Sequence, residues 1–222
     1  KTKFTFFSPQ RMGTGKGTDL LWKALKICKT DFDILQVDWF DEATDEELKI
    51  REQLLNELPS QIKLIPMIKR KKMPEYYSFA DAVIGNMIVG TWELVDLEGV
   101  MCGKPVLSYS DPNHKLLVKG NYIQSSFLPD SNKPEDIAKI IDKVVSSKEF
   151  RDELFENERK FVSNSTDKEW VSNWWDELFE TFSQKYGKIH KNSSSISIKI
   201  RMGLFLIGNR LYWKKIKKLI KI

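Results

Sequence analysis

Residues 91–108 read TWELVDLEGVMCGKPVLS, and they are the most informative part of the sequence. The spacing of its apolar residues predicts a short helix that carries one carboxylate, Glu98, among apolar neighbours. Gly103 is suited to end that helix, because glycine adopts the left-handed conformation without strain. An apolar strand at 106–107 follows. A helix, a tight turn and a buried strand form the kind of corner at which open α/β sheets collect ligand-binding groups. A plain helix-to-strand connection with one solvated Glu is the alternative.

Strand-like and helical patterns alternate through the first two thirds of the chain. The strands are predicted at 4–7, 32–37, 62–67, 82–84, 105–109 and 122–128, and the helices between them at 18–28, 45–58, 74–79 and within 91–103. This alternation favours βα units with right-handed crossovers. The simplest arrangement is an α/β fold with a Rossmann-like, doubly wound parallel sheet of about six strands.

After Pro134 the pattern predicts helices alone. They are expected at 134–145, 148–162 and 167–186. The last of them carries a stripe of Trp and Phe, which is typical of a core or a domain interface.

The positive net charge belongs to one end of the chain. The whole chain carries 36 Lys and Arg against 31 Asp and Glu, but residues 188–222 hold ten of the basic residues and no acidic one. Residues 1–187 therefore hold 26 basic against 31 acidic residues, so nucleic-acid binding by this part is not indicated. We expect one domain at 1–187, a Ser-rich linker at 192–195, and a basic amphipathic tail within 188–222.

The tail mixes apolar and aromatic residues with Lys and Arg from 196 to 222, and residues 211–222 have helical spacing. A basic amphipathic helix with Trp and Tyr suits an anionic membrane surface, at about 1 kcal/mol per basic residue. A helix that covers the domain itself or a partner is the alternative. No signal peptide or continuous transmembrane stretch is visible. We therefore expect a cytoplasmic protein, peripheral on the inner face of the membrane.

The two cysteines, Cys28 and Cys102, form no recognisable disulfide or metal pattern, which suits a reducing compartment. The two histidines, His114 and His190, have no plausible nucleophile or metal partner nearby in the sequence. We expect no metal site, because no cluster has ligand spacing. The chain starts at Lys1 and enters a strand pattern at once, so we expect a piece of a longer protein.

A glycine-rich loop follows the first predicted strand. Residues 8–18 read SPQRMGTGKGT, with glycines at three alternate positions. Such glycines let the backbone approach a ligand, and a helix N-terminus offers unpaired N–H groups. Arg11 and Lys16 add two positive charges suited to a diphosphate. The spacing matches neither the Walker phosphate loop nor the dinucleotide fingerprint. A flexible, solvated turn is the alternative.

Taken in order, these motifs resemble the C-terminal, donor-binding half of a GT-B fold retaining glycosyltransferase of the group 1 type. Residues 8–21 resemble the family's strand, Arg, four residues, Lys-Gly and helix. Residues 62–84 resemble its third strand, docking helix and fourth strand. Residues 97–107, LEGVMCGKPVL, are similar to its signature LEAMACGKPVI. The resemblance covers about residues 3–185, including the helical region after the last strand.

The resemblance implies a role for each matched residue. Arg11 and Lys16 would hold the donor diphosphate and stabilise the leaving nucleotide, without a metal or another cofactor. Glu98 would accept hydrogen bonds from the ribose hydroxyls. Backbone N–H groups around Leu94 and Val95, at the start of the helix, would complete the phosphate site.

Met67 and Ile68, at the exit of the third strand, would lie near the base. One position departs from the family pattern. The family usually has a second Glu, eight residues before the position of Glu98, that contacts the donor sugar. This chain has Gly90 there, and Glu93 is offset by three residues. The departure leaves sugar recognition and activity open.

We therefore expect the donor-binding domain of a glycosyltransferase that uses a UDP- or GDP-type sugar. Its acceptor would be a glycan or a lipid-linked molecule. The N-terminal GT-B domain, which supplies the acceptor side in this fold, is missing from this chain and would be needed for turnover. A non-catalytic nucleotide-sugar-binding or scaffold module is the alternative, and Gly90 favours it. A nucleotide-sugar epimerase is a third hypothesis, disfavoured by the signature at 97–107.

Overall fold

The computed structural model describes residues 2–40, 44–111, 113, 115–118, 121–124 and 131–165, with isolated positions at 172, 173, 176, 180 and 184. Residues 1–167 form one compact unit and residues 168–222 form a second. The helix expected at 167–186 and the basic tail lie outside the described residues, apart from those isolated positions. The domain boundary expected after residue 187 stays a prediction.

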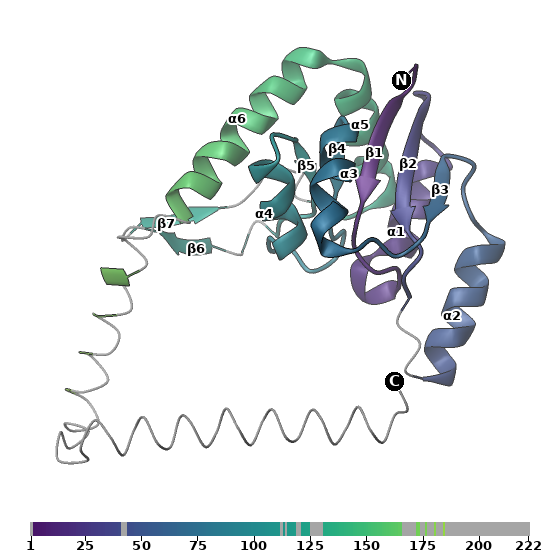
Figure 1. Cartoon of the computed structure of the whole chain (residues 1–222), viewed down its shortest axis with the longest axis horizontal. Helices are drawn as coiled ribbons and strands as arrows, with labels where there is room; N and C mark the ends of the chain where they lie inside the picture. Colours follow the sequence, from purple (N-terminus) through teal and green to yellow (C-terminus); the bar gives the residue numbers. More distant parts are fainter. Residues whose placement is uncertain are drawn as a thin grey trace. The chain divides into compact units, whose positions relative to one another are not determined.

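The elements of the first unit alternate as the sequence predicts (Figure 1). In chain order they are β1 (Phe4–Ser8), η1 (Thr14–Lys16), α1 (Thr18–Leu25), β2 (Phe32–Val37), α2 (Asp45–Asn56), β3 (Ile62–Ile65), η2 (Arg70–Lys72), α3 (Met73–Phe79), β4 (Ala82–Ile84), α4 (Leu94–Met101), β5 (Val106–Leu107), β6 (Lys115–Val118), β7 (Asn121–Gln124), α5 (Pro134–Ser146) and α6 (Lys148–Ser165).

Five strands form one parallel sheet in the order β3-β2-β1-β4-β5. The chain runs outward from β1 in one direction, then returns and continues from β4 in the other. This reversal is the topological switch point of a doubly wound fold, where ligands bind outside the carboxyl ends of the strands. The predicted α/β, Rossmann-like class is confirmed.

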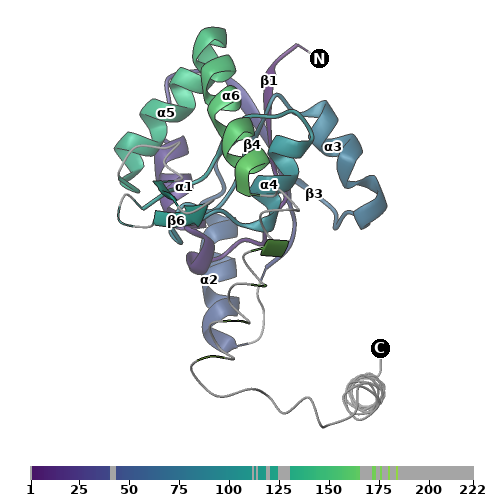
Figure 2. The same cartoon turned by 90° about the vertical axis from the view of Figure 1, so that its left-hand side faces the viewer.

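Helices cover both faces of the sheet (Figure 2). Successive strand residues point to opposite faces, so Phe6 packs with α1 and α5 while Phe7 packs with α3 and α4. Both phenylalanines are fully buried. Burial on both faces explains why the strands read as apolar runs without alternation.

The sixth predicted strand does not join the parallel sheet. β7 pairs antiparallel with β6, and the two strands form a separate sheet. The reason is the short connection. β6 ends at Val118 and β7 begins at Asn121, and a two-residue loop can join only antiparallel neighbours. Residues 125–128 of the predicted strand lie outside the described residues.

Helix α4 ends as the sequence predicts. Gly103 has a φ of +77°, and its N–H donates to the Val100 carbonyl at 2.9 Å. The strand that follows, β5, is held from the side by Glu158 of α6, whose carboxylate accepts the Val106 N–H at 2.9 Å. Burial raises the pKa of Glu158 well above its ordinary value. The segment 91–108 is therefore fixed at both its turn and its strand.

Candidate functional site

A cleft lies at the carboxyl ends of β1, β2 and β4. Its volume is about 410 Å³, and it is lined by Pro9, Gln10, Arg11, Lys16, Trp39, Glu93, Leu94 and Val95. These residues come from the loop after β1, the segment after β2 and the start of α4, which are far apart in the sequence. Four of the predicted site residues, Arg11, Lys16, Leu94 and Val95, are thus brought together in one cavity.

The glycine-rich loop is an ordered turn bound to its neighbours. Gly13 donates its N–H to the Thr18 hydroxyl at 3.0 Å, and the Lys16 carbonyl accepts the Met87 N–H at 3.1 Å. Gly17 has a φ of +68°, and a β-carbon there would lie 2.9 Å from the Met87 side chain. A residue other than glycine would be both strained and crowded at this position. The loop backbone is therefore fixed against the β4–α4 connection.

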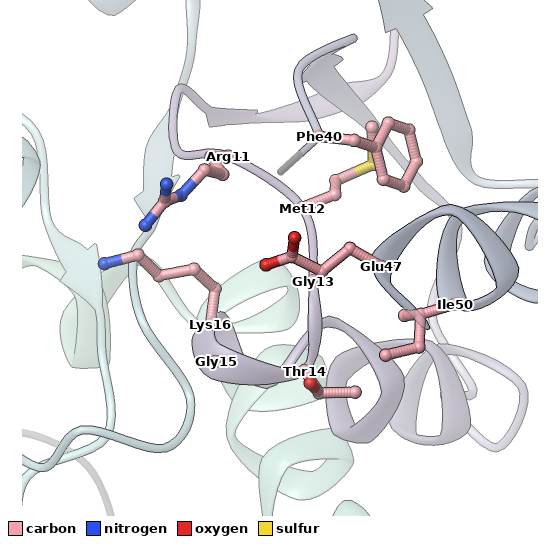
Figure 3. Close-up of a pocket in the computed structure, with 9 residues that line it drawn as sticks. All are labelled: Arg11, Met12, Gly13, Thr14, Gly15, Lys16, Phe40, Glu47 and Ile50. Carbon is pink, nitrogen blue, oxygen red and sulfur yellow. The ribbon is translucent and has the colours of Figure 1, made fainter. Parts of the chain in front are cut away.

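The two cations of the loop point to the same side (Figure 3). The Arg11 guanidinium carbon lies 6.0 Å from the centre of the Trp39 ring, at the distance of a cation–π contact. A smaller cavity of about 190 Å³ lies along the same loop, with Phe40, Glu47 and Ile50 in its lining. Arg11 and Lys16 line both cavities, so the positive charges of the loop lie where the two cavities adjoin.

Lys16 forms an ion pair with Glu93, the residue that precedes α4. Their side chains are only 20% and 27% exposed. Asn86 donates to the second carboxylate oxygen of Glu93 at 3.3 Å. The sequence shows Glu93 only as an acidic residue three places from the expected position, so its pairing with Lys16 was missed. Its place just before a helix start was the one available signal.

A buried carboxylate, Asp96, supports this corner. Its Oδ2 accepts the Glu93 N–H at 2.7 Å and the Ser108 hydroxyl at 3.3 Å. Its Oδ1 has no hydrogen-bond partner within the described residues. A β-carbon added to Gly85 would lie only 1.9 Å from this oxygen. Burial raises the pKa of Asp96 from 3.8 to about 7. The Gly85 carbonyl in turn accepts a hydrogen bond from the Gln10 side chain at 2.5 Å, which connects this corner to the loop after β1.

Glu98 lies one turn further along α4 and does not line the cleft. It shares a helix face with Leu94 and Val95, because residues three and four apart are neighbours on a helix. Its carboxylate accepts the Tyr77 hydroxyl at 3.0 Å and the Arg70 guanidinium at 2.6 Å. Burial raises the pKa of Tyr77, so its hydroxyl stays a donor. The sequence did not single out these two partners.

Three further predicted residues lie outside the cleft lining. Met67 and Ile68 follow β3 and lead to Arg70, the partner of Glu98, and Met67 is exposed. Gly90 lies in the β4–α4 connection with a φ of +77°, and its carbonyl accepts the Asp111 N–H at 3.0 Å. A Glu at this position would have to adopt a backbone conformation that side-chain-bearing residues rarely take. The backbone thus gives a physical reason for glycine here.

Within residues 2–40, 44–111 and the other described segments, no group of three or more His, Cys, Asp and Glu side chains is arranged to hold a metal ion. Metal independence stays a prediction. None of the helices in the same residues is both long and apolar enough to span a bilayer.

Comparison with known proteins gives one matching family and a set of similar solved structures. The model of the family "Glycosyl transferases group 1" matches residues 1–161. No protein among those with curated functions matches the sequence. The solved structures give clear similarities, and their sequence identities are low enough that they establish the fold alone.

HepE from Anabaena, solved with UDP and glucose, matches with a TM-score of 0.58 at 19% identity over 82% of this chain. The trehalose-6-phosphate synthase OtsA matches with a TM-score of 0.62 at 14% identity over 79% of this chain. The catalytic domain of cholesterol-α-glucosyltransferase from Helicobacter pylori matches with a TM-score of 0.53 at 17% identity, over 74% of this chain and 100% of that one. The chain spans 48% of HepE and 43% of OtsA. The expected GT-B C-terminal fold is confirmed.

Proposed function

The chain belongs to the glycosyl transferases group 1 family, and from this premise we propose that it is the donor-binding domain of a glycosyltransferase. The donor is a nucleoside-diphosphate sugar of the UDP or GDP type. One observation carries the proposal: Arg11, Lys16 and the first residues of α4 line a single cleft, and Glu98 lies one turn further along the same helix.

The cleft suits a diphosphate. Arg11 offers a planar set of donors and Lys16 a compact charge, and both come from an ordered loop. The N–H groups at the start of α4 add the positive end of a helix dipole. As the bond between sugar and phosphate breaks, negative charge grows on the departing nucleotide. Fixed positive charge at this place stabilises that transition state without reorganisation.

Glu98 suits the ribose. Two ribose hydroxyls are donors, and an ionised carboxylate with two oxygens accepts both. Tyr77 holds this carboxylate from the buried side, while the Arg70 pair is on the exposed side and can exchange for a ligand. The exit of β3 at Met67 and Ile68, which leads to Arg70, would then contact the base.

Turnover would need an acceptor-binding N-terminal domain outside this chain. The acceptor would be a glycan or a lipid-linked molecule, and the basic segment 196–222 would hold the protein on an anionic membrane. Replacing the five lysines Lys214, Lys215, Lys217, Lys218 and Lys221 by Gln tests the last point. The native chain is expected to sediment with anionic liposomes at low salt and the variant to stay in solution. Equal sedimentation would refute membrane binding by the tail.

A non-catalytic nucleotide-sugar-binding module is the second candidate. Two observations favour it: glycine at position 90 and the carboxylate of Glu93 against Lys16. Turnover of a donor by the complete protein separates the two, because a module of this kind binds the donor and leaves it intact.

Calorimetric titration of the chain with UDP, GDP and their sugars tests the shared part of both candidates. We expect one nucleotide series to bind, and Arg11→Ala and Glu98→Ala each to weaken that binding by about tenfold to a hundredfold. Glu75→Ala, which removes an exposed carboxylate of α3, is the matched control and should bind as the native chain does. Absence of binding for every nucleotide would remove the proposed function.

A further inference from the structure

Glu93 is a carboxylate in a cleft whose other charged residues are cations. Glu93 is the N-cap residue of α4 and forms a capping box with Asp96, but a phosphate in the cleft gains nothing from its carboxylate, because like charges repel. Yet its side chain is mostly buried, and Lys16 and Asn86 hold both of its oxygens. The position of Glu93 is therefore well defined, and it faces a space that a ligand would enter.

Trp39 lines the same cleft and is 44% exposed. It does not belong to either of the buried cores. Its backbone is fixed, because the Trp39 carbonyl accepts the Met12 N–H at 2.7 Å, and Arg11 lies over its ring. A large rigid aromatic face at a cavity offers contact area at low entropic cost.

The cleft is larger than a diphosphate requires. Its volume of about 410 Å³ falls in the range of sites for whole small molecules. A sugar ring has apolar C–H faces and a rim of hydroxyl donors. In this cavity an indole face can pack against the apolar C–H face of the ring, and a carboxylate can accept hydrogen bonds from its hydroxyls.

We propose that Glu93 and Trp39 are the residues that select the donor sugar. Glu93 accepts hydrogen bonds from ring hydroxyls, and Trp39 packs against the apolar face of the ring. Lys16 has three donors, so it holds Glu93 and a phosphate oxygen at the same time. This inference rests on the proposed function. The sugar-binding carboxylate is then that of Glu93, just before α4. The resemblance expects it at position 90, but the left-handed backbone of Gly90 disfavours a Glu there.

The test compares two affinities in each protein: that for UDP, and that for the best of UDP-glucose, UDP-galactose and UDP-N-acetylglucosamine, with GDP and GDP-mannose run in parallel. In the native chain the sugar conjugate should bind more tightly than the bare nucleotide. Glu93→Gln and Trp39→Ala should each reduce this preference about tenfold, as expected for loss of a hydrogen bond to a charged group or of an aromatic contact. Binding of the bare nucleotide should be unchanged or tighter in Glu93→Gln.

Two control variants keep the outcome interpretable. Glu47→Gln removes a carboxylate near the same loop but in the neighbouring cavity, and it should leave the preference as it is. Trp39→Phe keeps an aromatic face and should retain most of the preference, and a loss of preference as large as that of Trp39→Ala would contradict packing of the ring against the sugar. Thermal unfolding confirms that each variant is folded.

The failure modes differ. No nucleotide binding to the native chain would remove the proposed function and this inference with it. Nucleotide binding with no preference for any sugar, or a preference that Glu93→Gln and Trp39→Ala leave intact, would overturn this inference alone. Equal tightening of UDP and UDP-sugars in Glu93→Gln would also overturn it, since Glu93 would then act only as a competitor for Lys16.

Discussion

Two ion pairs lie along α4, one at its start and one a turn further along, and they are supported in different ways. Lys16 and Glu93 pair with side chains 20% and 27% exposed, whereas Arg70, the partner of Glu98, is 77% exposed. Behind the first pair lies a buried frame that includes Asp96, and Arg70 comes from a short 3₁₀ turn. The first pair is thus set before any ligand arrives, and the second can open for one.

The difference has an energetic consequence. An exposed ion pair contributes about 0–1 kcal/mol, because solvent screens it and ordering long side chains costs entropy. A carboxylate in a buried frame affects the fold far more when its surroundings change. We call the Lys16–Glu93 pair and the buried residues behind it the Lys16 end of the site, and the Arg70–Glu98 pair the Arg70 end. Mutations of residues that do not belong to the pair should therefore change the stability of the Lys16 end, whereas the Arg70 end should be affected only by changes in the pair itself.

The largest effect is expected from Gly85→Ala. The new β-carbon would lie 1.9 Å from Asp96 Oδ1, so the frame behind the Lys16 end must shift. We expect a loss of about 3 kcal/mol in the free energy of unfolding, measured by urea denaturation. Gly103→Ala is the control, because it is strained by its φ of +77° but meets nothing within 4 Å. It should cost about 1–2 kcal/mol. Equal losses in both variants would contradict the proposed crowding at Gly85.

The next largest effect is expected on ligand affinity, where Lys16→Ala and Glu98→Ala should differ. Lys16→Ala should weaken binding of both UDP and inorganic diphosphate by about tenfold to a hundredfold. Glu98→Ala should weaken UDP by a similar factor and leave diphosphate unaffected, because the ribose is absent from it. Isothermal titration measures all four values. Loss of diphosphate binding in Glu98→Ala would show that the two ends do not act separately.

An effect that is smaller when it is counted per unit of pH is expected from Asp96→Asn. The pKa of Asp96 in the folded protein is about 7, above the ordinary 3.8, so the folded state binds this proton more tightly than the unfolded state. The resulting stabilisation is complete below about pH 4 and is lost as the pH rises through 7. The native chain should therefore lose stability relative to Asp96→Asn between pH 4 and 7, by at most about 1.4 kcal/mol per pH unit. If the difference in free energy of unfolding between the native chain and Asp96→Asn does not vary with pH, the raised pKa of Asp96 is disproved.

The smallest effect is expected from Arg70→Ala. The Arg70 side chain is mostly exposed, so the free energy of unfolding should change by less than about 1 kcal/mol. The measurement is the same urea titration, with Lys71→Ala as the matched control in the same turn. A loss well beyond this range would mean that the Arg70 end is also part of the fixed frame.

The sequence predicted the elements of the first unit well, because apolar runs, Gly103 and the loop glycines are local signals. It placed Arg11, Lys16 and the start of α4 together through a resemblance to a known family, and the cleft joins them. It missed the Glu93 pair, since nothing in the residues near Glu93 indicates a lysine 77 positions earlier.

Burial was the other quantity that the sequence did not reveal. Asp96 looks like an ordinary acidic residue in a helix start, and only the tertiary packing shows that it is fully buried beside Gly85. The same holds for the Tyr77 hydroxyl on Glu98. The β6–β7 hairpin was missed because apolar runs alone do not distinguish a parallel strand from an antiparallel one.

A crystal structure of the chain with UDP would show where the nucleotide binds. We expect the diphosphate in the cleft against Arg11 and Lys16, with Glu93 still at its place before α4. We also expect the ribose hydroxyls on Glu98, with Arg70 displaced from that carboxylate. A nucleotide bound outside this cleft, or a ribose away from Glu98 with the Arg70 pair intact, would contradict these expectations.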